Sequence, residues 1–473
     1  MLKILLLNPP HPEAKGFTRE GRCTQEAGVW ATQWPPVSLA TTATFLENDG
    51  HQIKIIDCPA IGMNRQILKN ELGRFSPDMV FWNTATPTLS HDLDLGHLIK
   101  NVSPHATTGV IGTHVTALPE SALNFPGIDV VIRNEPEQTI REICFHPGSS
   151  WRKINGISYR SSDSGKIRHN SQRTFLKADS IPAPAWHLLD LSPYRLPLKG
   201  RPFLIVAPTR GCPFACSFCT ASLYYGRKPR QRPVKKVVDE IENNMRQFSI
   251  FDFFIWADTF TADNNYVENF CREIKKRDLK IRWTCNSRVD TVNKKLLTEM
   301  KSAGLWMISF GLESADDAIL EKSGKKINTA QSRLAVNNAH AVGLKVSGHF
   351  IFGLPGENSR SMARTLDLAM ELPLDIAQFY TAAPFPGTAL YAMAANRGWI
   401  SRDDGCSQNQ ASMHLPDLTP GQVDAFTRRA YKKFYLRLKI LLNLFSMLEP
   451  GALTGIGIGL KRFLGWTLHK NSG

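Results

Sequence analysis

Two series of short apolar segments alternate with helical patterns along the 473 residues, and this alternation restricts the fold more than any other feature. In the first series we predict strands at Lys3–Leu7, Gln52–Asp57, Asp78–Trp82, Thr108–Gly112 and Ile128–Ile132. A helical pattern such as that of Val37–Asn48 separates each strand from the next. This order predicts an α/β domain over residues 1–145, with an open, mostly parallel sheet of the doubly wound, Rossmann-like type.

The second series begins near residue 200, after a stretch rich in serine, glycine and proline that we expect to be a linker over residues 146–199. Its predicted strands are Phe203–Ala207, Phe251–Trp256, Ile281–Cys285, Trp306–Phe310, Lys345–Phe352 and Ile376–Ala382. These six strand–helix units predict a partial (β/α)6 barrel, TIM-like but two units short, over residues 200–390. We expect residues 391–473 to form a helical, basic C-terminal region.

The composition restricts the class of protein. Hydrophobic residues make up 42% of the chain and charged residues 21%, as in ordinary globular proteins. No charge-free run of eighteen or more apolar residues is present, so no membrane-spanning helix is predicted. Of nine cysteines, six are single and three are close together, which favours a metal site in a reducing cytoplasm over a disulfide framework.

The three clustered cysteines follow the first strand of the second series. Cys212, Cys216 and Cys219 have the spacing C-x-x-x-C-x-x-C and lie at the strand end where parallel barrels place their active sites. Iron–sulfur clusters normally take four thiolates, so three ligands would leave one iron of a 4Fe-4S cluster open for a further ligand. Zinc is the alternative, but zinc ribbons use two separated cysteine pairs and no second pair follows here. The spacing therefore favours the iron–sulfur cluster.

This triplet, with the residues at the strand ends that follow it, resembles the radical S-adenosylmethionine superfamily over about residues 200–390. The resemblance implies that one iron chelates S-adenosylmethionine. It also implies a set of side chains and glycines around that ligand, namely Phe218, Asp258, Arg288, Gly311, Glu313, Gly353 and Pro355. Within it, Phe218 lies near the adenine, Asp258 accepts from the methionine amino group and Glu313 binds the ribose. Phe350 departs from the family pattern, which has isoleucine at this position.

Each of these residues also has a plainer interpretation. Asp258 can be a helix N-cap, Glu313 a surface residue and the glycines simple turns. Their order at consecutive strand ends favours a shared site instead.

The first domain resembles the cobalamin-binding domain that precedes the barrel in many of these enzymes. The matching segments imply that cobalamin is contacted by Pro9, Asn83, Thr84, Gly112, Thr113, His114 and Glu135. The sequence lacks the D-x-H-x-x-G motif whose histidine coordinates cobalt in cobalamin mutases, since Asp57–Gly62 contains no histidine. The alternative is a sheet that holds no cofactor and only covers the barrel.

The C-terminal region interleaves cations with large apolar residues over Arg428–Phe445 and again over Leu460–Trp466. One interpretation is a helix that packs one face on the barrel and exposes a basic face to water. The other is an interfacial helix that contacts anionic lipid, which would place the protein in the cytoplasm with a peripheral contact at the inner face of the membrane. We do not expect nucleic acid as a partner, because no known RNA-binding module is present.

Taken together, the resemblance implies a cobalamin-dependent, class B radical S-adenosylmethionine methyltransferase. Such an enzyme methylates an unactivated carbon of a small or lipid-like substrate through a 5′-deoxyadenosyl radical, and it draws electrons from a reductase, flavodoxin or ferredoxin. The sequence identifies no catalytic side chain. Two alternatives stay open: a cobalamin enzyme that forms or rearranges a ring, and a non-catalytic iron–sulfur or corrinoid carrier.

The ligand assignment predicts the outcome of single substitutions. After anaerobic reconstitution the chain should bind about four irons and show the absorption of a 4Fe-4S cluster. Replacing Cys212, Cys216 or Cys219 with alanine should abolish both signals. Loss of the cluster in Cys271→Ala or Cys285→Ala variants would show that the assignment is wrong.

Overall fold

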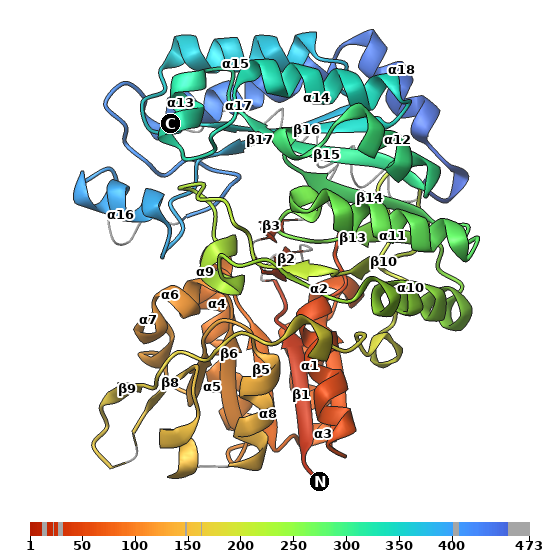
Figure 1. Cartoon of the computed structure of the whole chain (residues 1–473). Helices are drawn as coiled ribbons and strands as arrows, with labels where there is room; N and C mark the ends of the chain where they lie inside the picture. The colour runs from red at the N-terminus through yellow and green to blue at the C-terminus, as the bar shows by residue number, and fades with distance from the viewer. Residues whose placement is uncertain are drawn as a thin grey trace.

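The computed structural model describes residues 1–11, 17–21, 23–26, 32–146, 149–161, 163–400 and 406–452. These residues form two α/β bodies, the N-terminal one below and the C-terminal one above in Figure 1. Within them, no helix is both long and apolar enough to cross a membrane. The expected segment Leu460–Trp466 lies outside the described residues.

The lower body is built on a parallel sheet with the strand order β4-β1-β5-β6-β7. The strands are β1 (Lys3–Asn8), β4 (Gln52–Asp57), β5 (Met79–Asn83), β6 (Thr107–Ile111) and β7 (Val130–Ile132). Its helices are α1 (Val37–Asn48), α2 (Cys58–Ile61), α3 (Arg65–Phe75), α4 (Leu89–Leu93), α5 (Leu95–Val102), α6 (Thr113–Ala117), α7 (Pro119–Leu123) and α8 (Glu137–Phe145). All five predicted strands are present, each within two residues of its predicted bounds, because strands of a sheet with helices on both faces are buried on both sides and form short continuous apolar runs.

The segment expected to be a linker contributes two further strands. β8 (Ile157–Arg160) pairs antiparallel with β7, and β9 (Ile167–His169) pairs antiparallel with β8, so the hairpin extends the sheet. After the hairpin, Trp186 and Tyr194 are buried in the core. The sequence indicates a small hairpin-like segment at Ile157–Arg160 within the expected linker, and the structure shows that this hairpin belongs to the first sheet. The domain boundaries themselves stay a prediction.

The upper body is the predicted six-stranded parallel sheet, with its strands in chain order. They are β10 (Phe203–Val206), β13 (Asp252–Ile255), β14 (Arg282–Ser287), β15 (Leu305–Glu313), β16 (Lys345–Phe352) and β17 (Ile376–Thr381). The accompanying helices are α9 (Ala221–Tyr225), α10 (Val234–Phe248), α11 (Asn264–Lys276), α12 (Lys294–Ser302), α13 (Asp317–Lys322), α14 (Thr329–Ala341), α15 (Ser359–Glu371) and α16 (Ala389–Asn396). The side chains of Asp263, Asn293, Asn328 and Asn358 cap the N-termini of α11, α12, α14 and α15, which fixes where each helix begins after its strand.

A small hairpin, β2 (Phe17–Glu20) with β3 (Cys23–Glu26), lies between the two bodies (Figure 1). Arg19 of β2 forms two hydrogen bonds of 2.8 Å with the buried carboxylate of Asp92 and a third, of 3.2 Å, with the carbonyl of Pro9. The backbone and hydroxyl of Ser38, at the start of α1, donate to the Glu20 carboxylate. Strand β2 therefore covers the carboxyl edge of the first sheet.

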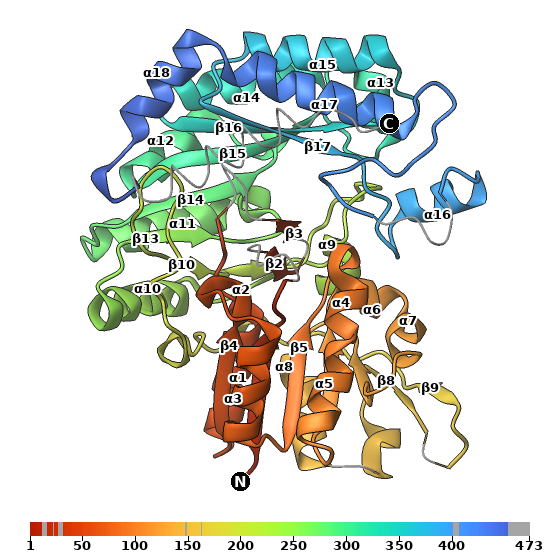
Figure 2. The ribbon, with the colours of Figure 1, turned by 180° about the vertical axis from the view of Figure 1, so that it is seen from behind.

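Two C-terminal helices, α17 (Pro420–Tyr435) and α18 (Leu438–Met447), complete the upper body on the side that faces the viewer in Figure 2, with α17 packed against β17. The hydroxyl of Tyr435 donates to the carbonyl of Ala377 at 2.7 Å and accepts from its N–H at 3.2 Å. The hydroxyl of Tyr431 accepts from the N–H of Phe379 at 3.1 Å. A partial barrel leaves the edge of its last strand unpaired, so these tyrosines satisfy backbone groups that would otherwise be exposed.

Removing the Tyr435 hydroxyl tests this edge contact. The Tyr435→Phe variant leaves both backbone groups of Ala377 without this partner, so the free energy of unfolding should fall by about 1–3 kcal/mol. Tyr159→Phe is a matched control, because the buried Tyr159 hydroxyl has no hydrogen-bond partner among the described residues. Urea titration of the two variants measures the difference, and an equal loss in both would contradict the proposed role of Tyr435.

Candidate active site

The cysteine loop leaves the barrel immediately after β10 and is closed at its base. Two residues on each side, β11 (Thr209–Arg210) and β12 (Arg230–Gln231), pair antiparallel, with Arg210 opposite Arg230. Gly211 has a φ of +91°, and a Cβ there would lie 2.5 Å from the carbonyl oxygen of Lys228. Only glycine fits this turn without strain, so the turn directs Cys212 toward the barrel.

The base of this loop is held by the first domain. The guanidinium of Arg210 is buried and contacts Glu135 at 3.0 Å and Glu137 at 2.6 Å. Arg230, on the other side of the base, contacts the same Glu135 carboxylate at 2.8 Å. The N–H of Leu176 donates to Glu135 as well, at 2.9 Å. Both ends of the loop therefore converge on one carboxylate, and the two carboxylates hold the pKa of Arg210 well above its ordinary value against the effect of burial.

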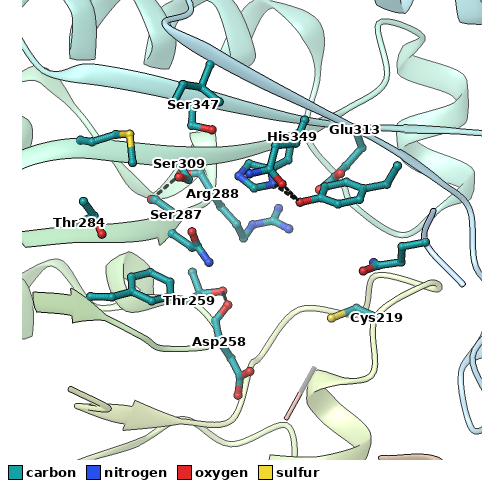
Figure 3. Close-up of a pocket in the computed structure, with 18 of the residues that line it drawn as sticks. Cys219, Asp258, Thr259, Thr284, Ser287, Arg288, Ser309, Glu313, Ser347 and His349 are labelled. Carbon is teal, nitrogen blue, oxygen red and sulfur yellow. Dashed lines mark hydrogen bonds between the residues drawn. The ribbon is translucent and has the colours of Figure 1, made fainter. Parts of the chain in front are cut away.

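A cavity of about 340 Å³ opens inside the barrel at the carboxyl ends of the strands. The predicted residues that line it are Cys212, Cys216, Cys219, Phe218, Asp258, Arg288, Gly311 and Glu313. Figure 3 shows part of this set around the cavity. The described residues include no group of three His, Cys, Asp or Glu side chains that could hold one metal ion. A four-iron cluster differs from a single ion in that each thiolate binds its own iron, so the thiolates need not meet at one point.

Asp258 and Thr259, at the end of the second barrel strand, contact the cysteine loop. The Asp258 carboxylate accepts from the N–H of Gly211 at 2.9 Å, and the Thr259 hydroxyl lies 3.6 Å from the sulfur of Cys212. Asp258 is not the helix cap that the plainer interpretation proposed, because Asp263 caps α11. Thr259 was not predicted, and only its position next to Asp258 could have indicated it.

Arg288 follows β14 and lies directly over the loop. Its guanidinium stacks on the ring of Phe214 at 3.8 Å and reaches the sulfur of Cys216 at 3.8 Å. Two further hydrogen bonds of 2.8 Å join it to the carboxylate of Asp290. Burial raises the pKa of the Cys216 thiol, while the positive charges of Lys325 and Arg288 act in the opposite direction. The two cations partly offset the effect of burial on the thiolate, which is the form that binds iron, but burial prevails and the pKa of Cys216 stays above its ordinary value.

Glu313 is buried and paired, so the surface interpretation of this residue does not hold. Lys325 donates to its Oε1 at 2.7 Å, and both side chains are buried. A bulge in β15 between Gly311 and Glu313 gives Glu313 a φ of +62°, which is rare for a residue with a side chain. Burial lowers the pKa of Lys325, but the Glu313 carboxylate outweighs that effect, so the pKa lies above its ordinary value.

Gly311 leaves room for this ion pair. A Cβ on Gly311 would lie 2.4 Å from Glu313 Oε1 and 2.7 Å from Lys325 Nζ. Lys325 was missed by sequence reasoning, because a lysine after Gly324 carries no pattern that distinguishes it from a surface residue.

Gly353 and Pro355 are not among the residues that line the cavity. They form a turn after β16 whose N–H groups, at Gly353 and Leu354, donate to the buried carboxylate of Glu357 at 2.7 and 3.0 Å. Burial raises the pKa of Glu357 to about 8. Phe350, which replaces the isoleucine of the family pattern, is buried and stacks on Phe379 at 5.4 Å.

The cavity continues along the barrel sheet beyond the cysteine loop. His349 of β16 and Tyr380 of β17 line it and stack at 5.8 Å, with the Tyr380 hydroxyl 3.3 Å from His349 Nδ1 and also bonded to Gln378 (Figure 3). The remaining wall has apolar side chains, namely Phe254, Trp306, Met307, Ile351, Ile376 and Met447, and also smaller polar ones, namely Thr284, Asn286, Ser309 and Ser347. Apolar surface therefore lies in the same cavity as the cysteine loop.

The seven residues expected to contact cobalamin lie at or just beyond the carboxyl ends of β1, β5, β6 and β7. Gly112 has a φ of +149°, and a Cβ there would lie 2.2 Å from the carbonyl oxygen of Thr84. His114 is buried, lies 3.1 Å from the Thr86 hydroxyl and has its pKa lowered to about 4 by burial, so it is neutral at pH 7. The hydroxyl, amide and imidazole groups along this edge are hydrogen-bond donors and acceptors, which suits the amide groups of a corrin. Glu135, by contrast, is engaged by Arg210, Arg230 and Leu176.

Comparisons with known proteins agree with both halves of this arrangement. The model of the radical SAM superfamily matches residues 206–369, and that of the B12 binding domain matches residues 27–144. The chain is 34% identical over 449 residues to the uncharacterized methyltransferase PH0819 of Pyrococcus horikoshii, covering 94% of each chain. It is 29% identical to the anaerobic magnesium-protoporphyrin IX monomethyl ester cyclase of Rubrivivax gelatinosus, over 76% of this chain and 66% of that protein.

Solved structures show the same fold. The radical S-adenosylmethionine methyltransferase TsrM from Kitasatospora setae, with cobalamin and a 4Fe-4S cluster bound, gives a TM-score of 0.70 at 16% identity and covers 95% of this chain and 90% of that one. The expected fold class, enzyme class and cofactors are confirmed: a 4Fe-4S cluster, S-adenosylmethionine and cobalamin. The chain therefore belongs to the cobalamin-binding radical SAM methyltransferase family.

Proposed function

We propose that this enzyme methylates an unactivated carbon of a small, apolar or lipid-like molecule bound in the barrel cavity. The observation that carries the proposal is that one cavity contains both the cysteine loop and an apolar wall. An apolar wall favours an apolar substrate, because burying its surface supplies binding energy without unpaired polar groups.

The residues around the cysteine loop would each have a distinct part in binding the cofactors. We assign Cys212, Cys216 and Cys219 to the cluster, and Phe218, Asp258, Arg288, Gly311 and Glu313 to S-adenosylmethionine. Gly353 and Pro355 act indirectly, through the turn that Glu357 fixes. When bound, these cofactors supply a carbon-centred radical and a transferable methyl group. The chain orients them and excludes water from the cavity.

His349 and Tyr380 are the polar side chains in the apolar part of the cavity that we assign to substrate orientation. The two rings stack on each other and Tyr380 is hydrogen-bonded to Gln378, so their polar groups are held in place in the cavity that also contains the cysteine loop. A hydroxyl, carbonyl or similar group of the substrate would bind there, while its apolar part contacts residues such as Phe254 and Ile351. The electron donor we propose is a flavodoxin, a ferredoxin or a dedicated reductase. None of the cysteines whose side chains the structure describes is joined in a disulfide, which supports work in the reducing cytoplasm.

Ring formation is the second candidate, because the Rubrivivax gelatinosus relative is named a cyclase. We favour methylation because the Pyrococcus horikoshii relative, which aligns over 94% of both chains, is named a methyltransferase. The carrier interpretation is not favoured, because carriers have no need of a substrate cavity beside the cluster.

Because we assign Glu313 and Gly311 to S-adenosylmethionine, we expect the Gly311→Ala variant to bind this ligand more weakly. The added Cβ must displace the Glu313–Lys325 ion pair. Strain of about 1–3 kcal/mol would weaken S-adenosylmethionine binding about 5- to 150-fold. Equilibrium dialysis under anaerobic conditions measures the dissociation constant, and iron content should stay that of the unmodified protein.

Gly421→Ala is the matched control, since nothing lies within 4 Å of a Cβ at that helical position. Unchanged affinity in Gly311→Ala, with the ion pair displaced, would show that Glu313 does not contact the ligand.

The reaction itself is tested with S-adenosylmethionine carrying a deuterated methyl group. Incubation of the reconstituted, reduced enzyme with apolar extracts should yield 5′-deoxyadenosine and a product that gains the labelled methyl, detected by mass spectrometry. The Cys216→Ala variant should give neither. A product that lacks the label but has lost hydrogen would favour ring formation, and the absence of 5′-deoxyadenosine in every extract would favour a carrier.

A further inference from the structure

The helices α17 and α18 bring an excess of positive charge to one surface of the upper body. Residues 420–448 contain six cations and one carboxylate, Asp424. Four of these cations, Arg428, Arg429, Lys432 and Lys433, line one shallow groove on α17 together with Leu436 and Arg437. The opposite face of α17 is buried on β17 through Phe434 and Tyr435, so the helix is held by its apolar face and presents the cations outward.

Next to this groove, α18 carries an exposed apolar stripe. Leu438, Leu441, Leu442 and Phe445 are 71%, 37%, 60% and 67% exposed. Their spacing of three and four residues places them on one face of the helix. Ile440 and Met447, on the other side of α18, are buried. An apolar stripe of this kind at the surface of a globular protein indicates a contact with another apolar phase or molecule.

Leu436 connects the groove to the stripe along the chain. Leu436 lies between the two helices, is 68% exposed and lines the groove with the cations. Both helices lie on the outside of the upper body, at the top of Figure 2. We define the docking surface as Arg428, Arg429, Lys432, Lys433, Leu436, Leu438, Leu441, Leu442 and Phe445.

We propose that the docking surface binds an anionic lipid membrane. Exposed leucine and phenylalanine flanked by lysine and arginine is the arrangement that interfacial helices use, with the apolar face at the acyl boundary and the cations on the headgroups. A second copy of this chain fits the surface less well, because a symmetric contact would place cations opposite cations without carboxylates between them.

The docking surface also lies next to the substrate cavity. Met447, at the end of α18, lines the cavity together with Leu198 and Lys199 of the segment that precedes β10. Glu449 ties the two segments together through Lys199 at 3.1 Å and Arg201 at 2.9 Å. If the substrate is lipid-like, as the proposed function holds, this arrangement places the cavity close to the membrane that would contain it. Membrane binding itself does not depend on that function.

Vesicle co-sedimentation of the full-length, reconstituted protein tests the proposal. At low salt the protein should bind vesicles rich in phosphatidylglycerol and leave phosphatidylcholine vesicles unbound, and added salt should release it. Substituting Arg428, Arg429, Lys432 and Lys433 with glutamine should weaken binding by about 100-fold or more, because each cation near an anionic surface contributes to affinity.

The matched control replaces four exposed lysines of α10, α11 and α12 with glutamine, namely Lys235, Lys276, Lys294 and Lys295. It removes the same charge elsewhere and should leave binding nearly unchanged. Leu438→Ser with Leu442→Ser should weaken binding while the melting temperature stays close to that of the unmodified protein, since both side chains are exposed.

Three outcomes would overturn the proposal. The first is absence of binding to phosphatidylglycerol vesicles at low salt. The second is equal binding by the quadruple glutamine variant and its control. The third is a dimer, seen by light scattering, that Leu438→Ser with Leu442→Ser dissociates while vesicle binding is unaffected. In each case 5′-deoxyadenosine formation in solution reports separately on the proposed function, because no residue of the docking surface lies in the cavity.

Discussion

The buried cluster of Arg210, Arg230, Glu135 and Glu137 is the interaction on which the rest of the structure depends. It lies where the cysteine loop leaves the barrel and joins that loop to the first domain. A buried guanidinium is costly without partners, so the charges hold each other in place and the geometry tolerates little change. The cysteine loop and the first sheet meet at these four side chains. The loop is therefore held in a fixed position relative to the edge of the sheet that is expected to bind cobalamin.

The barrel contributes a second constraint through its incomplete closure. Six strands leave the sheet open between β10 and β17, and the free edge of β17 is covered by the tyrosines of α17. The open side is closed by the segment before β10 and by the end of α18, which together form one wall of the cavity. In this protein the C-terminal helices therefore shape the cavity as well as cover the sheet.

The fold of this enzyme does not by itself decide which reaction it performs. A methyltransferase and a cyclase both align with the chain, so the shared fold does not decide the reaction. Here the cavity combines apolar side chains such as Phe254 and Ile351 with polar ones, among them His349 and Tyr380.

The sequence by itself determined the order of elements and the residues that need a particular chemistry. The alternation of apolar and helical segments indicated both sheets, because burial on both faces leaves short apolar runs between amphipathic helices. The spacing of Cys212, Cys216 and Cys219, and the placement of Asp258, Arg288 and Glu313 at strand ends, indicated a common site, and these six side chains line one cavity.

Only the tertiary structure decided which charges meet. Two ion pairs illustrate this. Arg210 and Glu135 are 75 residues apart in the sequence, and Lys325 and Glu313 are 12 residues apart. No local pattern connects the members of either pair. Likewise, the sequence of α17 and α18 shows cations beside leucines but not which of them are exposed, since that depends on how the helices pack on β17. Long-range contacts are set by the packing of whole elements, whereas motif chemistry and periodicity are local, and the sequence displays only the local part directly.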